Sequence, residues 1–600
     1  MKKITWDKNH FYVNGKPEKF VSGSVHYFRI PPEYWYDRLL KLKESGCNTV
    51  ETYVSWHLHE KVQGELDFTG WLDLAAYLDV VKELGLYAVV RPGPYICSEC
   101  DFGGLPWWLL KTPDIGIRCS DKRYLDACTP YLEKVCEIIR PYLISNDGPV
   151  AFVQIENEYG SYGNDKEYLK WLRDFYLSHG IDCAFITSDG AFSMLVKNGT
   201  LDGVIGSVNY LNDAETAFGV LNSICPNQPN AVMELWNGRQ DHWNSNRPPR
   251  DVDEVKKSVE DACKYAEFIN LYMFHGGTTW GYMNSIHEKD ELTVVTNSYD
   301  VDAPVDEFGR RTPKFYAEQE VICKARGIEV VNTATDTEIR KYPDAKLAGQ
   351  CSLTESGLDI KRNSSTTIMP MESYDQGYGY IVYETETIVD WDNTYLSLPV
   401  VHDIAHVYID GEYRATFLRT DNVRDMKIEN GTHKIAILVE NMGRVQIGRT
   451  MIDRKGLLGD IILDVRGINI FVKPLGFTVY NLPIDKLPVN YSGNIDIDAP
   501  AFYKYELEID DVCDTIVNLE GFTRGVVFAN GFNLGRHWDT VNVNNRAYIP
   551  APLLKKGKNE IVIFDVLARD SEKRVYFGEY KKDVEFNDFR HNQKTVRDGE

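Results

Sequence analysis

Residues 148–160, GPVAFVQIENEYG, decide the fold of this chain. The segment 149–153 is apolar without alternation, which is the pattern of a strand that is covered on both faces of a parallel sheet. The polar residues that follow it at once are Gln154, Glu156, Asn157 and Glu158. An ionisable side chain at the end of a buried strand costs free energy unless it is paired or used. We therefore expect a second charged group beside this strand end.

A second strand of the same form supplies a candidate partner. Residues 230–236, NAVMELW, are a short apolar run whose last residues include Glu234. Barrel enzymes carry their chemistry at the carboxyl ends of their strands. Two carboxylates at two such ends suit glycoside hydrolysis, which needs one proton donor and one nucleophile or base. For a lone glutamate, the alternative is a capping or salt-bridging role.

The region from 19 to about 328 alternates short apolar strands with longer helical segments. We place the strands near residues 20–28, 48–54, 86–92, 149–156, 182–188, 202–209, 230–236 and 268–275. Helical spacing of apolar residues predicts helices at 32–45 and 251–267, and residues 313–327 form the last helix of the region. Eight βα repeats over about 300 residues favour a (β/α)8 TIM barrel over a doubly wound sheet.

After residue 330 the pattern changes to short alternating strands and turn pairs, which indicates β-sandwich or jelly-roll modules. Residues 406–417, HVYIDGEYRATF, and 526–538, VVFANGFNLGRHW, have the same hairpin pattern, and each is followed by a similar apolar strand. This duplication predicts two all-β modules. We expect a catalytic barrel at 1–328, a first β-sandwich at 329–480 and a second at 481–600.

Composition narrows the classes of function. The chain has 66 basic and 89 acidic residues and a net charge of −23, which argues against nucleic-acid binding and favours a neutral or weakly charged substrate. The first residues contain no apolar core of signal-peptide length, and no later run is long enough to cross a membrane, so we expect a cytoplasmic protein. The pair Cys97 and Cys100 stands without a second pair or clustered histidines, so we expect neither a metal nor a cofactor.

Seven ordered blocks make the whole chain resemble the family 35 glycoside hydrolases, whose best-known members are β-galactosidases. The blocks are SGSVHYFRIPPEYW (22–35), NTVETYVSWHLHE (48–60), VVRPGPYICSECDFGGLPWWL (89–109), VQIENEYGSYG (153–163), MELWNGRQDHW (233–243), NLYMFHGGTTWGYMN (270–284) and NSYDVDAP (297–304). The resemblance implies a retaining enzyme that removes terminal β-galactosyl residues from oligosaccharides. It implies Glu158 as the general acid/base and Glu234 as the nucleophile.

The resemblance also implies a set of sugar-binding residues. These are Tyr53, Ser98, Glu99, Asn157, Tyr282 and Tyr299. Asn157 would bond the sugar 2-hydroxyl, and tyrosines in loops have packing as their alternative role. We expect Glu156 to support the site from behind, while His57 and His59 are candidates for either structural or sugar contacts.

Five positions depart from the pattern of the family. Where the family has Trp, Tyr, Trp, Asn and, in some β-1,3-specific members, Tyr, this chain has Arg239, Val301, Cys100, His57 and Ile447. Arg239 is therefore a candidate contact for the leaving group, and with Val301 it leaves the preferred sugar and linkage open.

Two rival functions remain. The same mechanism could act on another β-glycoside, such as an N-acetylhexosaminide, or the chain could bind carbohydrate without catalysis. Retention of Asn157, Glu158 and Glu234 disfavours the second. Neither the G-x-S-x-G motif of acyl transfer nor a phosphate-binding P-loop occurs in the sequence. The all-β modules offer surface for a homodimer, which the sequence leaves open.

Overall fold

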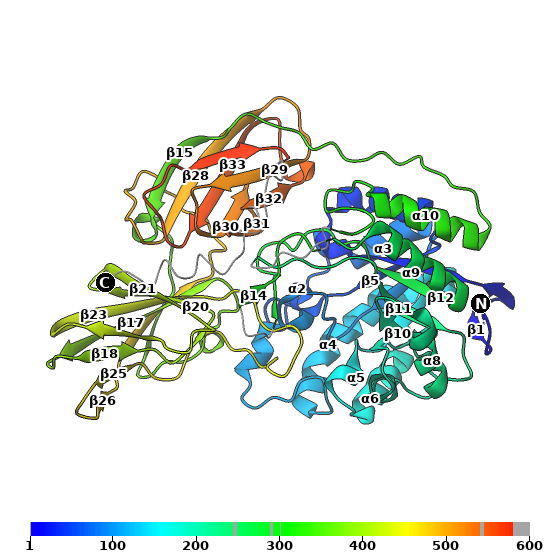
Figure 1. The fold of residues 1–600 in the computed structure, drawn as a ribbon, viewed down its shortest axis with the longest axis horizontal. Helices are drawn as coiled ribbons and strands as arrows, with labels where there is room; N and C mark the ends of the chain where they lie inside the picture. The colour runs from blue at the N-terminus through cyan, green and yellow to red at the C-terminus, as the bar shows by residue number, and fades with distance from the viewer. Residues whose placement is uncertain (1, 244–248, 288–291, 300–301, 541–544, 580–600) are drawn as a thin grey trace. The chain divides into compact units, whose positions relative to one another are not determined.

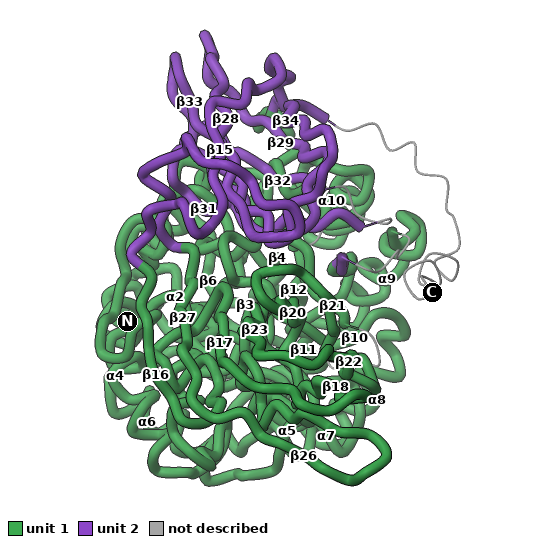
Figure 2. Tube along the Cα trace, turned by 90° about the vertical axis from the view of Figure 1, so that its left-hand side faces the viewer, with its two compact units in different colours: residues 1–240, 248–337, 360–484 green, residues 241–247, 338–359, 485–600 purple. Residues whose placement is uncertain are grey.

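The computed structural model of the chain describes residues 2–243, 249–287, 292–299, 302–540 and 545–579. The chain divides into two compact units, coloured green and purple in Figure 2. The first contains residues 1–240, 248–337 and 360–484, and the second contains 241–247, 338–359 and 485–600. The domain boundaries expected near 328 and 480 stay predictions.

The first unit contains a parallel sheet with the strand order β8-β7-β6-β5-β4-β12-β11-β10-β9. Its strands are β4 (Phe20–Val25), β5 (Thr49–Tyr53), β6 (Tyr87–Arg91), β7 (Val150–Gln154), β8 (Ala184–Ile186), β9 (Asp189–Gly190), β10 (Val208–Tyr210), β11 (Ala231–Trp236) and β12 (Phe268–His275). β8 and β9 are separated by only two residues and form one irregular strand. Next to this strand lies Ile205, shortly before β10: Thr187 N donates to Ile205 O (2.8 Å), and Ile205 N donates to Phe185 O (3.0 Å). These bonds close the ring as an eight-stranded barrel, and the eight predicted strands are confirmed.

A helix follows each strand of the barrel in the chain. In chain order these helices are α1 (Trp35–Glu44), α3 (Leu74–Glu83), α4 (Lys122–Ile139), α6 (Lys166–Ser178), α7 (Ser193–Gly199), α8 (Ala214–Ile224), α9 (Val252–Tyr265) and α10 (Pro313–Arg326). Figure 1 labels α3, α4, α8, α9 and α10 among the helices around the barrel strands. The predicted helices at 32–45, 251–267 and 313–327 correspond to α1, α9 and α10. Asp251 caps α9 by accepting a hydrogen bond from Asp253 N (2.9 Å).

Aromatic packing fills the amino-terminal end of the barrel. Phe20 begins β4, Phe268 begins β12, and both are fully buried with Phe11 of the N-terminal hairpin and Phe152 of β7. The rings of Phe20 and Phe152 meet edge to face with centroids 4.9 Å apart. The strands are parallel, so the polar residues at their carboxyl ends lie at the opposite end of the barrel from this aromatic packing.

The first all-β module belongs to the same compact unit as the barrel. One sheet has the order β16-β27-β17-β23-β20-β21 and another has the order β22-β18-β25-β26. Their strands are β16 (Arg362–Ser365), β17 (Tyr380–Val389), β18 (Thr394–Ser397), β20 (Ile404–Ile409), β21 (Glu412–Leu418), β22 (Asp425–Ile428), β23 (Gly431–Glu440), β25 (Ile462–Val465), β26 (Ile470–Val472) and β27 (Phe477–Leu482). Both sheets contribute to one buried core, for example through Ile437 and Leu463, so the module is a β-sandwich.

The second unit is also built from antiparallel sheets, with orders β15-β28-β33-β30-β31 and β32-β29-β34. Its strands are β15 (Lys346–Ser352), β28 (Ala501–Ile509), β29 (Thr515–Glu520), β30 (Arg524–Ala529), β31 (Phe532–Trp538), β32 (Arg546–Ile549), β33 (Gly557–Asp565) and β34 (Arg574–Phe577). β15 precedes the first module in the chain but pairs with β28. The expected α/β barrel followed by all-β structure is therefore present.

The duplicated hairpin is β20–β21 in one module and β30–β31 in the other. The turns Asp410-Gly411 and Asn530-Gly531 both have positive φ angles, 55° and 87° in the first and 46° and 87° in the second. Each first turn residue also accepts a backbone hydrogen bond from the strand that pairs next, through Lys434 N or Glu560 N (2.9 Å each). The two hairpins therefore share turn geometry as well as sequence.

Candidate active site

Glu234, near the carboxyl end of β11, lies among hydrogen-bond donors. Its Oε1 accepts from Tyr53 OH (3.1 Å) and from Arg91 Nη2 (2.8 Å), and its Oε2 accepts from Trp236 Nε1 (3.1 Å). The carboxyl group is buried, with 5% of the residue exposed. Three donors, one of them a guanidinium, therefore orient the carboxyl group of Glu234.

Arg91 is the hub of this side of the site, and the sequence reasoning missed it. It ends β6, is fully buried, and its Nη2 also donates to Asn157 Oδ1 (2.6 Å). Its guanidinium lies 3.9 Å from the centroid of the Tyr53 ring. Nη1 faces the buried Glu51 at 3.5 Å. Burial raises the pKa of Glu51 to about 6, although Arg91 opposes that rise.

Glu158 has a different environment. It follows β7 in the left-handed region of backbone conformation (φ 45°), and among the described residues its carboxyl group accepts one hydrogen bond, from Asn209 Nδ2 to Oε1 (2.9 Å). Asn209 lies on β10 and is held by Ser188 Oγ, which donates to its Oδ1 (2.8 Å). Desolvation by the surrounding protein, reinforced by the charge of Glu234, raises the pKa of Glu158 to about 7.

Asn157 and Glu156 separate into two roles. Asn157 Oδ1 is occupied by Arg91 and by Gln154 Nε2 (3.2 Å), while its Nδ2 is buried and has no partner among the described residues. That donor is available to a ligand. Glu156 instead forms a bidentate pair with Arg118, with Nε–Oε1 and Nη2–Oε2 distances of 2.8 Å.

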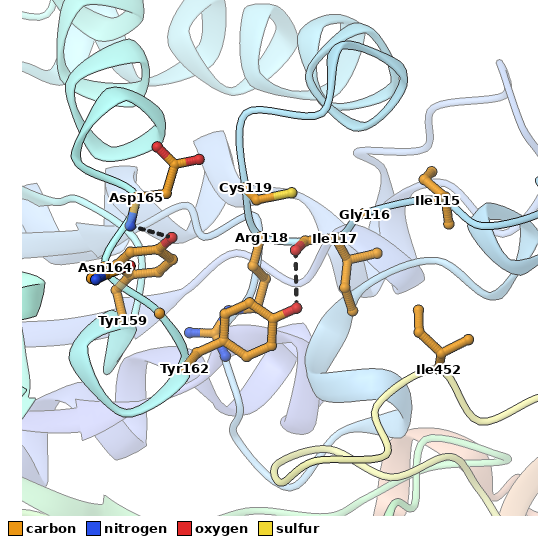
Figure 3. A pocket seen from close by; sticks show the side chains of 11 residues that line it. Ile115, Gly116, Ile117, Arg118, Cys119, Tyr159, Tyr162, Asn164, Asp165 and Ile452 are labelled. Atoms are coloured by element: carbon orange, nitrogen blue, oxygen red, sulfur yellow. Dashed lines mark hydrogen bonds between the residues drawn. The ribbon is translucent and has the colours of Figure 1, made fainter.

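A pocket of about 320 Å³ lies beside the Arg118 pair (Figure 3). Its lining includes Tyr159 and Tyr162 from the segment after Glu158, together with Ile452 from the first all-β module. Tyr162 OH donates to Ile117 O (3.0 Å) and its ring covers the Arg118 guanidinium at 4.3 Å. This packing fixes the segment that follows Glu158.

Glu99 and Tyr299 form a hydrogen-bonded pair of a carboxyl group and a phenol in the site. Tyr299 OH donates to Glu99 Oε2 and also meets Tyr272 OH at 2.7 Å, and the Tyr299 ring lies 4.0 Å from the Arg29 guanidinium. Desolvation raises the pKa of Glu99 to about 7, against the effects of Tyr299 and Arg29. A carboxylate next to a phenol can bind vicinal sugar hydroxyls by accepting and donating hydrogen bonds.

The other residues predicted to bind sugar have varied surroundings. Ser98 is 1% exposed, and its hydroxyl has no partner among the described residues, while its carbonyl accepts from Arg29 Nη2 (2.6 Å). The Tyr282 ring is half-buried and stacks on Tyr378 of the first all-β module with centroids 6.2 Å apart. Arg239 is exposed. Val301 lies outside the described residues.

The two histidines are packed into the structure. His59 Nε2 meets Tyr27 OH (2.6 Å), its Nδ1 meets Asp67 O (2.6 Å), and His57 Nδ1 meets Ser55 Oγ (2.8 Å). Burial lowers the pKa of His57 to about 3 and that of His59 to about 4. Among the described residues there is no group of three or more potential metal ligands, and no helix long and apolar enough to cross a membrane.

The strand ends of the barrel bring together three groups: Glu234 paired with Arg91, Glu158 with its raised pKa, and the amide donor of Asn157. This is the arrangement of a glycosidase site. Residues 10–325 match the family described as "Glycosyl hydrolases family 35". Residues 369–473 match "Beta-galactosidase, first all-beta domain", and residues 500–559 match "Beta-galactosidase, galactose-binding domain". The chain belongs to glycosyl hydrolases family 35, and it is a glycosidase.

Curated relatives agree over most of their length. The chain is 37% identical over 545 residues to "Beta-galactosidase" of Xanthomonas manihotis, with 88% of each chain covered. It is 35% identical over 573 residues to human "Beta-galactosidase-1-like protein 2", covering 90% of this chain and 86% of the relative. It is 34% identical over 604 residues to "Beta-galactosidase" of the cat, covering 94% and 88%.

Proposed function

We propose that the chain is a retaining exo-β-galactosidase that removes terminal, non-reducing β-galactosyl residues from oligosaccharides. The observation that carries the mechanism is the contrast between the two carboxyl groups. Glu234 receives hydrogen bonds from Arg91, Tyr53 and Trp236, whereas Glu158 receives one hydrogen bond and has a raised pKa. The galactosyl preference rests on the names of the relatives.

In the first step, the Glu234 carboxylate attacks the anomeric carbon while Glu158 gives its proton to the glycosidic oxygen. The bond between the anomeric carbon and that oxygen breaks, and the leaving alcohol departs with the proton. The free Nδ2 of Asn157 donates to the 2-hydroxyl of the sugar. Glu99 and Tyr299 bind other hydroxyl groups and fix the ring between the two carboxyl groups.

In the second step, the charge of Glu234 is absent because its oxygen is part of a glycosyl ester. The pKa of Glu158 then falls, since one of the causes that raised it has gone. Glu158 takes a proton from water as the water attacks the anomeric carbon, and the ester bond to Glu234 breaks. Two displacements at one carbon return the starting configuration.

The test is to trap the ester. A 2-deoxy-2-fluoro-β-galactoside with an activated leaving group should label the enzyme once, and mass spectrometry should find the label on the peptide that contains Glu234. NMR of the first product of a natural-type substrate should show the β-anomer. A first product with the α-configuration would exclude the retaining mechanism.

The rival sugar specificity is tested separately. A panel of aryl β-glycosides that differ only in the sugar should give the highest kcat/KM with galactose. A higher value with N-acetylhexosamine would support the second candidate, and no turnover of any member would support carbohydrate binding alone.

A further inference from the structure

The segment 97–102 that carries Glu99 has an unfavourable backbone. Cys97, Ser98, Glu99 and Phe102 all have positive φ angles, between 49° and 57°. Residues with a β-carbon rarely adopt this region, and a run of them persists only where surrounding contacts hold it. Contacts from the surrounding structure must therefore hold the segment that carries Glu99.

The first all-β module supplies one of these contacts through a buried ion pair. Arg444 Nη1 lies 3.0 Å from Asp101 Oδ2, and Arg444 N donates to Asp101 Oδ1 (2.5 Å). The other side of the guanidinium pairs with Glu372 Oε1 (2.6 Å from Nη2). All three side chains are at most 1% exposed. Asp101, two residues after Glu99, is thus fixed to a module more than 300 positions away in the sequence.

A second contact comes from Gln446, which is 1% exposed. Val445 pairs with Ile286 in a parallel bridge, which places Gln446 against the barrel loop. Its Oε1 accepts from Ser285 Oγ (3.0 Å), and its Nε2 meets His287 Nε2 (2.7 Å). The Gln446 carbonyl oxygen lies close against the same segment, because a β-carbon at Gly103 would be only 2.9 Å from it. From this place the Gln446 amide favours the charged form of Glu99. An amide nitrogen has two hydrogens, so the contact with His287 leaves one of them for a neighbouring acceptor.

We propose that Gln446, assisted by Arg444, is a positioning residue for sugar binding: the first all-β module holds the Glu99 carboxylate in place and orients its oxygens toward the sugar. This inference rests on the proposed function, in which Glu99 binds galactose hydroxyls. It makes the module a part of the binding site.

The proposal predicts a change in pH dependence. Besides Gln446, the titratable and charged groups that act on or face Glu99 are Tyr299, Tyr272, Arg29, Glu234, Glu158, Cys97 and Cys100. The Gln446 amide favours the charged form of Glu99, so its removal should raise the pKa of Glu99 further above its usual range. As the pH falls, Glu99 gains its proton and galactose affinity is lost. In the variant this loss should begin at a higher pH than in the wild type.

The experiment compares Gln446→Ala with Gln376→Ala in the full-length chain. Gln376 is a buried glutamine of the same module whose Nε2 donates to Tyr378 O and Tyr380 O (2.7 Å each), so it controls for loss of a buried amide. Calorimetry from pH 5 to 9 should give a galactose Kd that rises about 5- to 30-fold in Gln446→Ala, with its acid limb moved to higher pH. Gln376→Ala should keep the wild-type limb.

Amide hydrogen exchange of residues 97–104 separates this inference from the proposed function. Exchange should be faster in Gln446→Ala than in Gln376→Ala, whether or not galactose is the ligand. Unchanged exchange together with an unchanged pH limb would overturn the positioning role. If the wild-type protein binds no galactose but exchange is faster in Gln446→Ala, the proposed sugar is overturned. The inference that the first all-β module holds the Glu99 segment then stands.

Discussion

The surroundings of Glu158 and Glu234 differ although both are glutamates at the carboxyl end of a barrel strand. Glu234 has a guanidinium, a phenol and an indole as donors. Glu158 has one amide donor, and its pKa is raised to about 7. Two similar positions in the barrel thus receive different donors, and the side chains around each carboxyl group set its environment.

The largest expected effect comes from the charged side of the pair. Glu234→Gln removes the nucleophile, so turnover should fall to background with every substrate, including dinitrophenyl glycosides. Steady-state assays on a substrate series measure this. Azide that restored turnover with an inverted product in this variant would be the expected result for the nucleophile, whereas retained product would mean that the two roles are reversed.

The next effect comes from the protonated side. Glu158→Gln should lose about 10²- to 10⁴-fold in kcat/KM on substrates whose leaving group needs a proton, as expected for general acid catalysis. Formation of the glycosyl-enzyme from a dinitrophenyl galactoside should be nearly spared. Azide should then speed breakdown of that ester, and the product should be the β-galactosyl azide. Equal losses on all leaving groups would contradict the assignment.

Arg91→Met removes the cation that distinguishes the two sites. Arg91 donates to Glu234 and opposes the rise in the pKa of Glu158, so its loss should lower activity about 10- to 100-fold near neutral pH and move the alkaline limb of kcat/KM to higher pH. Arg118→Met is the matched control, because it removes an equally buried guanidinium that pairs with Glu156. An alkaline limb that moved equally in both variants would deny Arg91 a specific role.

A smaller effect is expected at Asn209. Asn209→Ala removes the donor that favours the charged form of Glu158, so the pKa of Glu158 should rise and the protonated acid should persist to higher pH. The alkaline limb of kcat/KM, expected near pH 7 in the wild type, should therefore move upward. Rate profiles across pH 5 to 9 measure the limb, and a downward move would show that another group sets it.

The smallest effect is expected at Arg239, which is exposed. Arg239→Trp should change aryl galactoside rates by less than about twofold. It should shift kcat/KM toward β-1,3-linked galactosyl-N-acetylglucosamine, because the new indole offers a plane for stacking in place of a guanidinium that forms hydrogen bonds. Competition between linkage isomers measures the shift. Wild-type preference for the β-1,3 disaccharide would contradict a role for Arg239 in leaving-group choice.

Local pattern was enough to predict the barrel strands and the duplicated hairpin. Each barrel strand is a short apolar run, and the turns Asp410-Gly411 and Asn530-Gly531 carry the residues that positive φ angles favour. The pairing of β15 with β28 could not be predicted, because the whole first module separates the strands and the local sequence of neither strand specifies which strand it pairs with.

Local pattern identified fewer of the residues that form the site. Arg91 and Asn209 stand at strand ends, as Glu158 and Glu234 do, so the same signal of a polar residue after a buried strand could have found them. Gln446 gives no such signal. Its contact with Glu99 depends on how the first all-β module folds onto the barrel, which spacing along the chain does not encode.

The most direct test of the account is the pKa of Glu158 in two states of the enzyme. Carbon-13 NMR of glutamate-labelled protein, with Glu158→Gln used to assign the signal, can follow its titration in the free enzyme and in the fluoroglycosyl-enzyme. The pKa of Glu158 should be near 7 in the free enzyme and lower once Glu234 is esterified, because the neighbouring negative charge is then gone. A pKa that is ordinary in the free enzyme, or unchanged by the ester, would contradict it.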